Sequence, residues 1–164
     1  MTEPRLANLL RQGREGASRL GSRTSLLEVA TIAALFGGGL LILSEFLDLF
    51  TIEVGGIGVK HQAGGTNHAY AMLIIGAGAI VATLLARSTD QWPPAAAVAV
   101  LGAFALGLAL IGDLPDATRS DLVRGGRIAD AHPSIGFWVE LVGAILTLVS
   151  GLVLARLLRT RGTE

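Results

Sequence analysis

Residues Ile135–Ala155 read IGFWVELVGAILTLVSGLVLA and hold one charged side chain, Glu140. A helix crosses the roughly 30 Å of hydrocarbon in a bilayer with about 20 mostly apolar residues. Three more stretches meet or approach this length, at residues 26–50, 69–86 and 93–112. None of the four alternates with the period of two that marks a strand. Because every backbone polar group in lipid needs an internal partner, these stretches predict four membrane-spanning helices.

The composition of the whole chain agrees with a membrane protein. Of its 164 residues, 51% are apolar and only 16% are charged, whereas soluble domains average about 25% charged residues. The absence of cysteine excludes disulfides, thiolate metal sites and thiol catalysis. The formal net charge is zero, which gives no reason to expect a nucleic-acid partner. We therefore expect an all-α membrane protein, a bundle of four transmembrane helices in a single domain.

Arginine and lysine near the ends of the spans predict the orientation, because cytoplasmic segments carry an excess of both. One side of the predicted bundle has nine basic residues, and the other side has four. Both termini are therefore expected in the cytoplasm, with residues 26–158 as the transmembrane domain and 159–164 as a cytoplasmic tail. The arginine-rich composition suggests a bacterial protein of the inner (plasma) membrane.

The segments outside the spans carry weaker patterns. Residues 1–25 have leucines near helical spacing and arginines largely elsewhere, which predicts an amphipathic helix on the inner membrane surface. The alternative is a disordered tail whose arginines only set the topology. The predicted outer loops are residues 51–68 and 113–134. Apolar and polar residues alternate over Phe50–Val54, which favours a short strand. In the second loop, Asp116 could cap a short helix at Ala117–Arg124.

Small residues recur every four positions within the spans, which places them on one helix face. The third and fourth series are Ala95, Ala99, Ala103, Gly107 and Gly143, Thr147, Gly151, Ala155. Faces of this kind let helix backbones approach closely in a membrane. They predict packing contacts, and they leave open whether these lie inside the bundle or in an oligomer. Some of the series could also arise by chance in a chain this rich in alanine and glycine.

Acidic residues near the predicted outer ends of the spans are the candidate site. Glu45, Asp48 and Glu140 fall at similar depth, and His68, His132, Asp113 and Asp116 could join them. One interpretation is a cluster that binds a cation or relays protons, since carboxylates and histidines can hold a divalent metal. The other is that these groups mark the water boundary, each solvated or paired with a loop arginine.

Glu140 stands apart because aromatic and aliphatic residues surround it in the sequence. If its side chain faces the bundle, an unmatched charge would be costly. We then expect the carboxyl to be neutral or matched by a donor or a cation. The candidate partners are His68, His132, the loop arginines and Glu45.

Two stretches, Gly112–Asp116 (GDLPD) and Gly136–Glu140 (GFWVE), resemble small four-span bacterial integral membrane proteins of unassigned function. The resemblance implies the four-span fold and no activity. The chain has no His-x-x-x-His, Glu-x-x-His or Gly-x-Ser-x-Gly motif, so we expect no enzyme, metal or cofactor. The lipid bilayer and a membrane-protein partner, or a homo-oligomer, are the expected partners. We expect an accessory or scaffold subunit of a larger membrane complex; the alternative is a small transporter, channel or ion or proton sensor.

Overall fold

The computed structural model describes residues 25–54, 57–65, 69–119, 122–124 and 127–161. The predicted surface helix in residues 1–25 lies outside these residues, apart from Ser25, and so does His68. Both therefore remain predictions. The structure below is that of the described residues.

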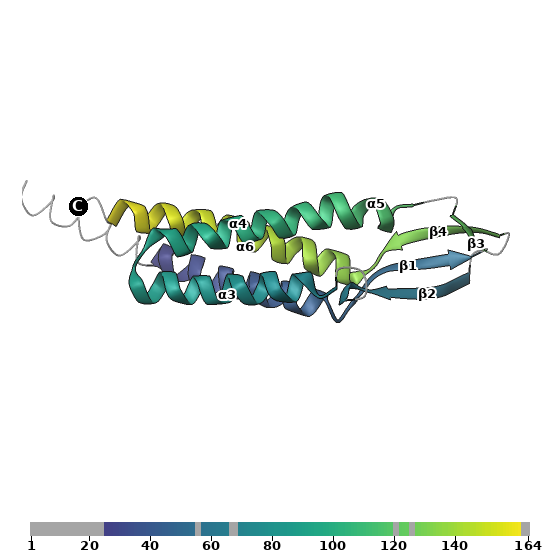
Figure 1. The fold of residues 1–164 in the computed structure, drawn as a ribbon, viewed down its shortest axis with the longest axis horizontal. Helices are drawn as coiled ribbons and strands as arrows, with labels where there is room; N and C mark the ends of the chain where they lie inside the picture. Colours follow the sequence, from purple (N-terminus) through teal and green to yellow (C-terminus); the bar gives the residue numbers. More distant parts are fainter. Residues whose placement is uncertain (1–24, 55–56, 66–68, 120–121, 125–126, 162–164) are drawn as a thin grey trace, which may run out of the picture.

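Within these described ranges, four helices are long and apolar enough to cross a membrane, which confirms the predicted spans (Figure 1). The first helix is Ser25–Ser44, and the second, α3, is Ala71–Thr89. The third span, Trp92–Ala117, consists of α4 (Trp92–Gly107), the π-helical turn η1 (Leu108–Asp113) and α5 (Leu114–Ala117). The fourth, α6, is Ile135–Arg161. The chain is therefore a multi-pass membrane protein.

All four predicted spans end at a different residue in the structure; α3 continues to Thr89 instead of residue 86, and α6 continues to Arg161 instead of residue 155. The first helix ends at Ser44, not at residue 50, because the chain turns there through hydrogen bonds from Phe46 N to Leu43 O and from Leu47 N to Ser44 O. The third span continues past Asp113 as far as Ala117. Pro115 does not stop it, because its fixed φ angle suits the first turn of α5, directly after η1.

Glycines mark the places where the helices cross. Gly38 of the first helix lies against Gly76 of α3, and Gly37 lies against Gly143 and Thr147 of α6. On the other side of the bundle, Gly151 lies against the backbone of Ala99 in α4. α4 also packs along α3, so the four helices form a closed ring in which each contacts two others.

The predicted outer loops fold into a four-stranded antiparallel sheet, so the all-α class was incomplete. Its strands are β1 (Asp48–Val54), β2 (Ile57–Ala63), β3 (Leu122–Arg124) and β4 (Arg127–Pro133), in the order β2-β1-β4-β3. The sheet extends beyond one end of the helices (Figure 1). The strand expected at Phe50–Val54 is confirmed. The helix expected at Ala117–Arg124 is wrong, because the last three of those residues pair with β4 instead.

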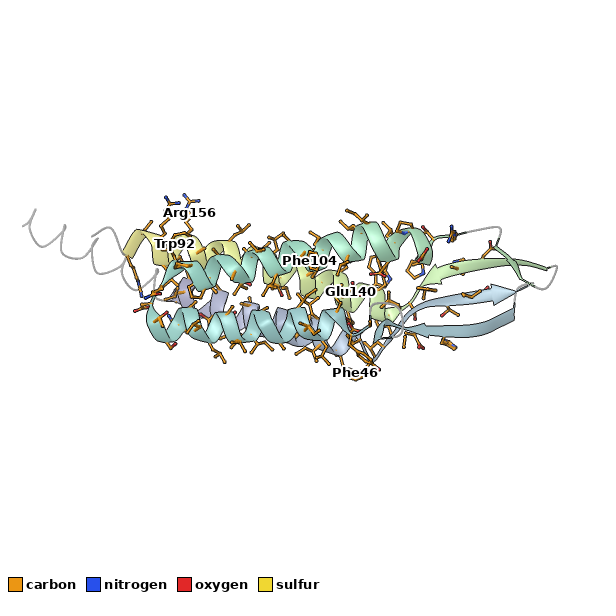
Figure 2. All side chains as sticks on the ribbon, in the orientation of Figure 1. Phe46, Trp92, Phe104, Glu140 and Arg156 are labelled. Atoms are coloured by element: carbon orange, nitrogen blue, oxygen red, sulfur yellow. The ribbon has the colours of Figure 1, made fainter. Side chains whose placement is uncertain are left out.

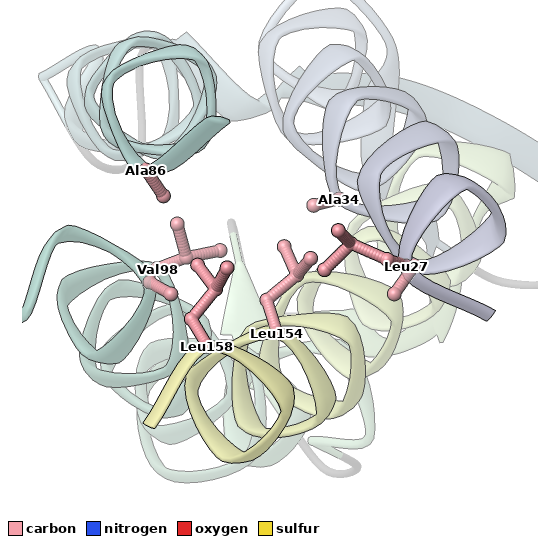
Figure 3. Close-up of a cluster of buried hydrophobic side chains, with 8 residues drawn as sticks. Leu27, Ala34, Ala86, Val98, Leu154 and Leu158 are labelled. Atoms are coloured by element: carbon pink, nitrogen blue, oxygen red, sulfur yellow. The ribbon is translucent and has the colours of Figure 1, made fainter. Parts of the chain in front are cut away.

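Three apolar clusters lie along the bundle. The one furthest from the sheet contains Leu27, Ala30, Ala34, Ala86, Ala95, Val98, Leu154 and Leu158, and its side chains point toward the common centre (Figure 3). The middle cluster contains Leu41, Met72, Ile75, Ala105 and Ala144. The third contains Leu49, Phe50 and Ala117 and joins the base of the sheet to α5.

Candidate functional site: a buried acidic layer

Three carboxylates are fully buried near the end of the bundle that carries the sheet. Glu45 follows the first helix, Asp113 ends η1 and Glu140 lies in the second turn of α6; their exposed fractions are 2%, 0% and 0%. Figure 2 shows Glu140 in the part of α6 nearest the sheet. An ionisable group inside a membrane-spanning bundle is costly and is by default a candidate functional residue.

Helix crossings place Glu45 and Glu140 at one level. A Cβ atom at Gly136 would lie 2.6 Å from the carbonyl oxygen of Asp48, and one at Gly143 would lie 3.0 Å from Cβ of Leu40. Glu140 is midway between these two glycines on α6. It is therefore level with the end of the first helix, where Glu45 lies.

Asp113 reaches the same level from the third span. Gly102 of α4 lies against Leu148 of α6, and the two helices run in opposite directions. Asp113 comes eleven residues after Gly102, which places it close to Phe137 along α6. The remaining offset from Glu140 is about three residues, or about 4.5 Å of helix rise. We call Glu45, Asp113 and Glu140 the acidic layer.

Apolar residues lie directly above and below the acidic layer. Leu41 is one turn before Glu45, Ala109 is one turn before Asp113, and Ala144 is one turn after Glu140. On the other side lie Leu49 and Phe50, at the base of the sheet. The layer is thus enclosed between the middle cluster and the base of the sheet.

Glu45 has a structural partner, the beginning of α3. The backbone N–H of Met72 donates a hydrogen bond of 2.6 Å to Oε1 of Glu45. Tyr70, the N-cap residue of α3, makes no side-chain capping bond. A carboxylate from the turn after the first helix therefore takes the place of a local cap, and the dipole of α3 favours its negative charge. Within the described part of the chain, Oε2 of Glu45 has no hydrogen-bond partner.

The backbone around this cap is tightly constrained. Ala69 and Tyr70, just before α3, have φ angles of 50° and 63°, in the left-handed region that costs non-glycine residues energy. On the other side, Gly65 N donates to the carbonyl oxygen of Glu45 at 3.0 Å. A Cβ atom at Gly64 would lie 2.9 Å from the carbonyl oxygen of Ser44, so only glycine fits. The segment after β2 thus closes over Glu45.

The other predicted members of the cluster lie outside the acidic layer. Asp48 is on β1, where its carboxylate lies 3.1 Å from Nδ1 of His61, with both side chains partly exposed. His132 is exposed on β4, opposite Thr51 of β1. Asp116 pairs with Arg119 at 3.5 Å on the surface. The structure therefore brings Glu45 and Glu140 to one level, and adds Asp113, which the sequence had named only as a residue that could join.

In the ranges that the structure describes, the buried hydroxyl groups do not form a chain of hydrogen bonds from one helix to the next. The buried hydroxyls of Ser44, Thr83, Thr147 and Ser150 each donate to a carbonyl oxygen of their own helix. Among the described residues, no group of three histidine or acidic side chains could hold a metal ion. The acidic layer is separated from the far end of the bundle by the middle cluster and by the apolar cluster furthest from the sheet, which Figure 3 shows.

Some of the small residues predicted to pack helices together are buried inside the bundle, and others face outward. Ala95, Ala99, Gly143 and Gly151 are buried between helices of the same chain. Ala103 is exposed and Gly107 is half-buried, on the outward side of α4. Gly102, which was not among the predicted packing residues, is the buried glycine at the closest approach of α4 to α6.

Comparison of the chain with models of protein families, with curated proteins and with solved structures found no match.

Proposed function

We propose that this chain is a non-enzymatic integral membrane protein that serves as an accessory or scaffold subunit of a larger membrane complex. The observation that carries the proposal is an apolar groove on the outward side of the third span. The groove has a volume of about 430 Å³ and is lined by Ala103, Phe104, Gly107, Leu108, Ile111 and Gly112.

The glycines of this groove are not needed for packing within the chain. A Cβ atom at Gly107 or Gly112 would meet no described atom within 4 Å. Glycine costs a helix about 1 kcal/mol relative to alanine, and in membranes small residues four apart allow another helix to approach closely. Ala103 and Gly107 form such a pair on the outward surface. A transmembrane helix of a partner protein fits this surface.

The closed core supports an accessory role more than transport. A transporter or channel needs a polar route between the two sides of the membrane. Here the half of the bundle away from the sheet is filled by alanine, valine and leucine side chains. The buried hydroxyls nearest to that half, on Thr83 and Ser150, are engaged with their own helices.

The proposal includes an orientation in a bacterial inner membrane. The end of the bundle away from the sheet carries Arg87, Arg156, Arg159 and Arg161, and an excess of arginine favours the cytoplasm. We therefore assign both termini to the cytoplasm and the sheet to the outer face. A reporter enzyme fused after Glu164 would report the side of the C-terminus directly.

Site-specific crosslinking in native membranes tests the proposed contact. A photoreactive residue at Gly107 is expected to give a discrete protein adduct, because a partner helix lies in the groove. The same residue at Ile74, which is 69% exposed on α3 at a similar depth, is expected to give no such adduct. Filling the groove with Ala103→Leu should abolish the adduct without changing the Tm of the purified protein.

Two outcomes would contradict the proposal. Equal adducts from positions 107 and 74 would indicate random collisions in the membrane. No adduct from either position would mean that the groove faces lipid alone.

A second candidate function, a proton or ion sensor, is favoured by the acidic layer. Three buried carboxylates between two apolar layers make the packing of the helices sensitive to charge, since repulsion between ionised carboxylates acts strongly at low dielectric. A sensor of this kind needs access from one side of the membrane only. A sensor is therefore compatible with a bundle whose half away from the sheet is filled by apolar side chains.

The fluorescence of Trp138 tests this second candidate. Its ring contacts Phe137 edge-on, with centroids 5.3 Å apart, two residues from Glu140. In a Trp92→Phe background, the emission of Trp138 is expected to change as the pH is lowered, and Glu140→Gln should remove the change while the helices stay folded. Asp116→Asn removes an exposed carboxylate and should leave the change intact. A response that survives in Glu140→Gln would exclude the acidic layer as its origin.

A further inference from the structure

The end of the bundle opposite the sheet carries an arginine pair on the lipid-facing side of α6. Arg156 and Arg159 are one turn apart and both exposed. Arg161, further along, is already engaged with Asp90 at 3.7 Å. Asp90, the acidic residue of the turn between α3 and α4, therefore pairs with Arg161 and does not neutralise the guanidinium groups of Arg156 and Arg159.

Trp92, the first residue of α4, lies beside Arg159, and Figure 2 shows Trp92 and Arg156 at the same end of the bundle. The guanidinium of Arg159 lies over its indole ring, with Cζ 5.9 Å from the ring centroid. Trp92 is 48% exposed. Tryptophan is typical of the level in a membrane where headgroups meet acyl chains. The arginine pair is thus held at the level of lipid phosphates.

An apolar stripe leads from the arginine pair toward the middle of the membrane. Val149, Leu152, Arg156 and Arg159 follow one another in steps of three, four and three residues, so the four side chains follow one face of α6. Val149 and Leu152 are 52% and 56% exposed, so they face lipid. From the middle of the membrane outward, this surface offers first apolar side chains that can contact an acyl chain and then guanidinium groups that can contact a phosphate. A phospholipid presents its acyl chain and its phosphate in the same order.

We propose that Arg156, Arg159 and Trp92 form a binding site for the headgroup of an anionic phospholipid, with an acyl chain along Val149 and Leu152. Guanidinium groups bind phosphate through charge-assisted, bidentate hydrogen bonds. Basic surfaces between transmembrane helices are known to select anionic headgroups. The apolar stripe commits the site to a lipid, since a free phosphate would gain nothing from it. The site is independent of the proposed partner groove, which lies nearer to the sheet.

Quenching of Trp92 fluorescence by lipids with brominated acyl chains tests the site. The full chain, with Trp138→Phe so that Trp92 is the single fluorophore, is reconstituted in vesicles of phosphatidylcholine and phosphatidylglycerol. Brominated phosphatidylglycerol is expected to quench Trp92 in preference to brominated phosphatidylcholine. The expected contribution to this preference is about fivefold for each arginine, from about 1 kcal/mol per basic residue near an anionic surface.

The matched variants separate a site from a general charge effect. Arg156→Gln/Arg159→Gln should reduce the preference to near unity, with unchanged circular dichroism because both side chains are exposed. Arg87→Gln/Arg119→Gln removes the same charge elsewhere and should keep the preference. An equal loss in both double variants would overturn the site in favour of bulk electrostatics. Equal quenching by the two lipids in the protein that keeps both Arg156 and Arg159 would show that no anionic lipid is selected.

Discussion

Replacing Gly151 with alanine is expected to destabilise the bundle, although the change adds a single methyl group. That methyl would collide with the backbone N and Cα of Ala99 in α4. Backbone atoms cannot move aside as a flexible side chain does, so α4 and α6 must separate locally. Overpacking of this kind typically costs about 1–3 kcal/mol. Unfolding in a titration of SDS against a mild detergent would report the loss as an earlier midpoint.

Gly39→Ala is the matched control, with the opposite expected sign. Gly39 is exposed on the first helix, and a Cβ atom there would meet no described atom within 4 Å. Alanine is the better helix former by about 0.5–1 kcal/mol, so this variant should unfold at the same or a higher SDS fraction. If Gly39→Ala and Gly151→Ala lowered stability equally, the close approach of α4 and α6 would not be the cause.

The helices could be predicted because their signal is local. Four apolar stretches of sufficient length were enough to define the spans. The prediction that the small residues pack between helices is correct for only some of them, and the geometry of the helix explains where it fails. A step of four residues turns a helix by about 400°, so each step drifts by about 40°. Ala95 and Ala99 are still buried, whereas the drift has carried Ala103 to the outside, and Gly102 and Ala105 take the inward positions.

The sheet and the acidic layer depend on contacts between distant residues. β1 pairs with β4 so that Phe50 lies opposite Pro133, and no local pattern connects these two loops. Asp113 is buried because the π-helical turn keeps Ala105, Ala109 and Asp113 on one inward face. The sequence instead predicts that the third span ends at residue 112 and that Asp113 lies in an outer loop. The apolar neighbours of Glu140 made its burial one of two interpretations that the sequence left open, and nothing in the sequence indicated that Glu45 caps α3.

Glu45→Ala is expected to loosen the beginning of α3, because it removes the acceptor of the Met72 N–H. A buried donor left without a partner costs about 1–3 kcal/mol, and the strained backbone at Ala69 and Tyr70 would then lack the bond that holds it. Hydrogen exchange followed by mass spectrometry should show faster exchange at Met72 and in the first turn of α3. Exchange at the end of α3, near Arg87, should be unchanged.

Glu45→Gln separates the hydrogen bond from the charge. The amide oxygen of glutamine can still accept from Met72, so only the favourable interaction of the charge with the helix dipole is lost, about 0.3–1 kcal/mol. Exchange in this variant should therefore lie between the wild type and Glu45→Ala. Asp48→Ala, which breaks the partly exposed pair with His61, should leave the first turn of α3 protected, since exposed ion pairs contribute little. If Glu45→Ala exchanged at the wild-type rate, the carboxylate would not be the cap of α3, and the burial of Glu45 would need another explanation.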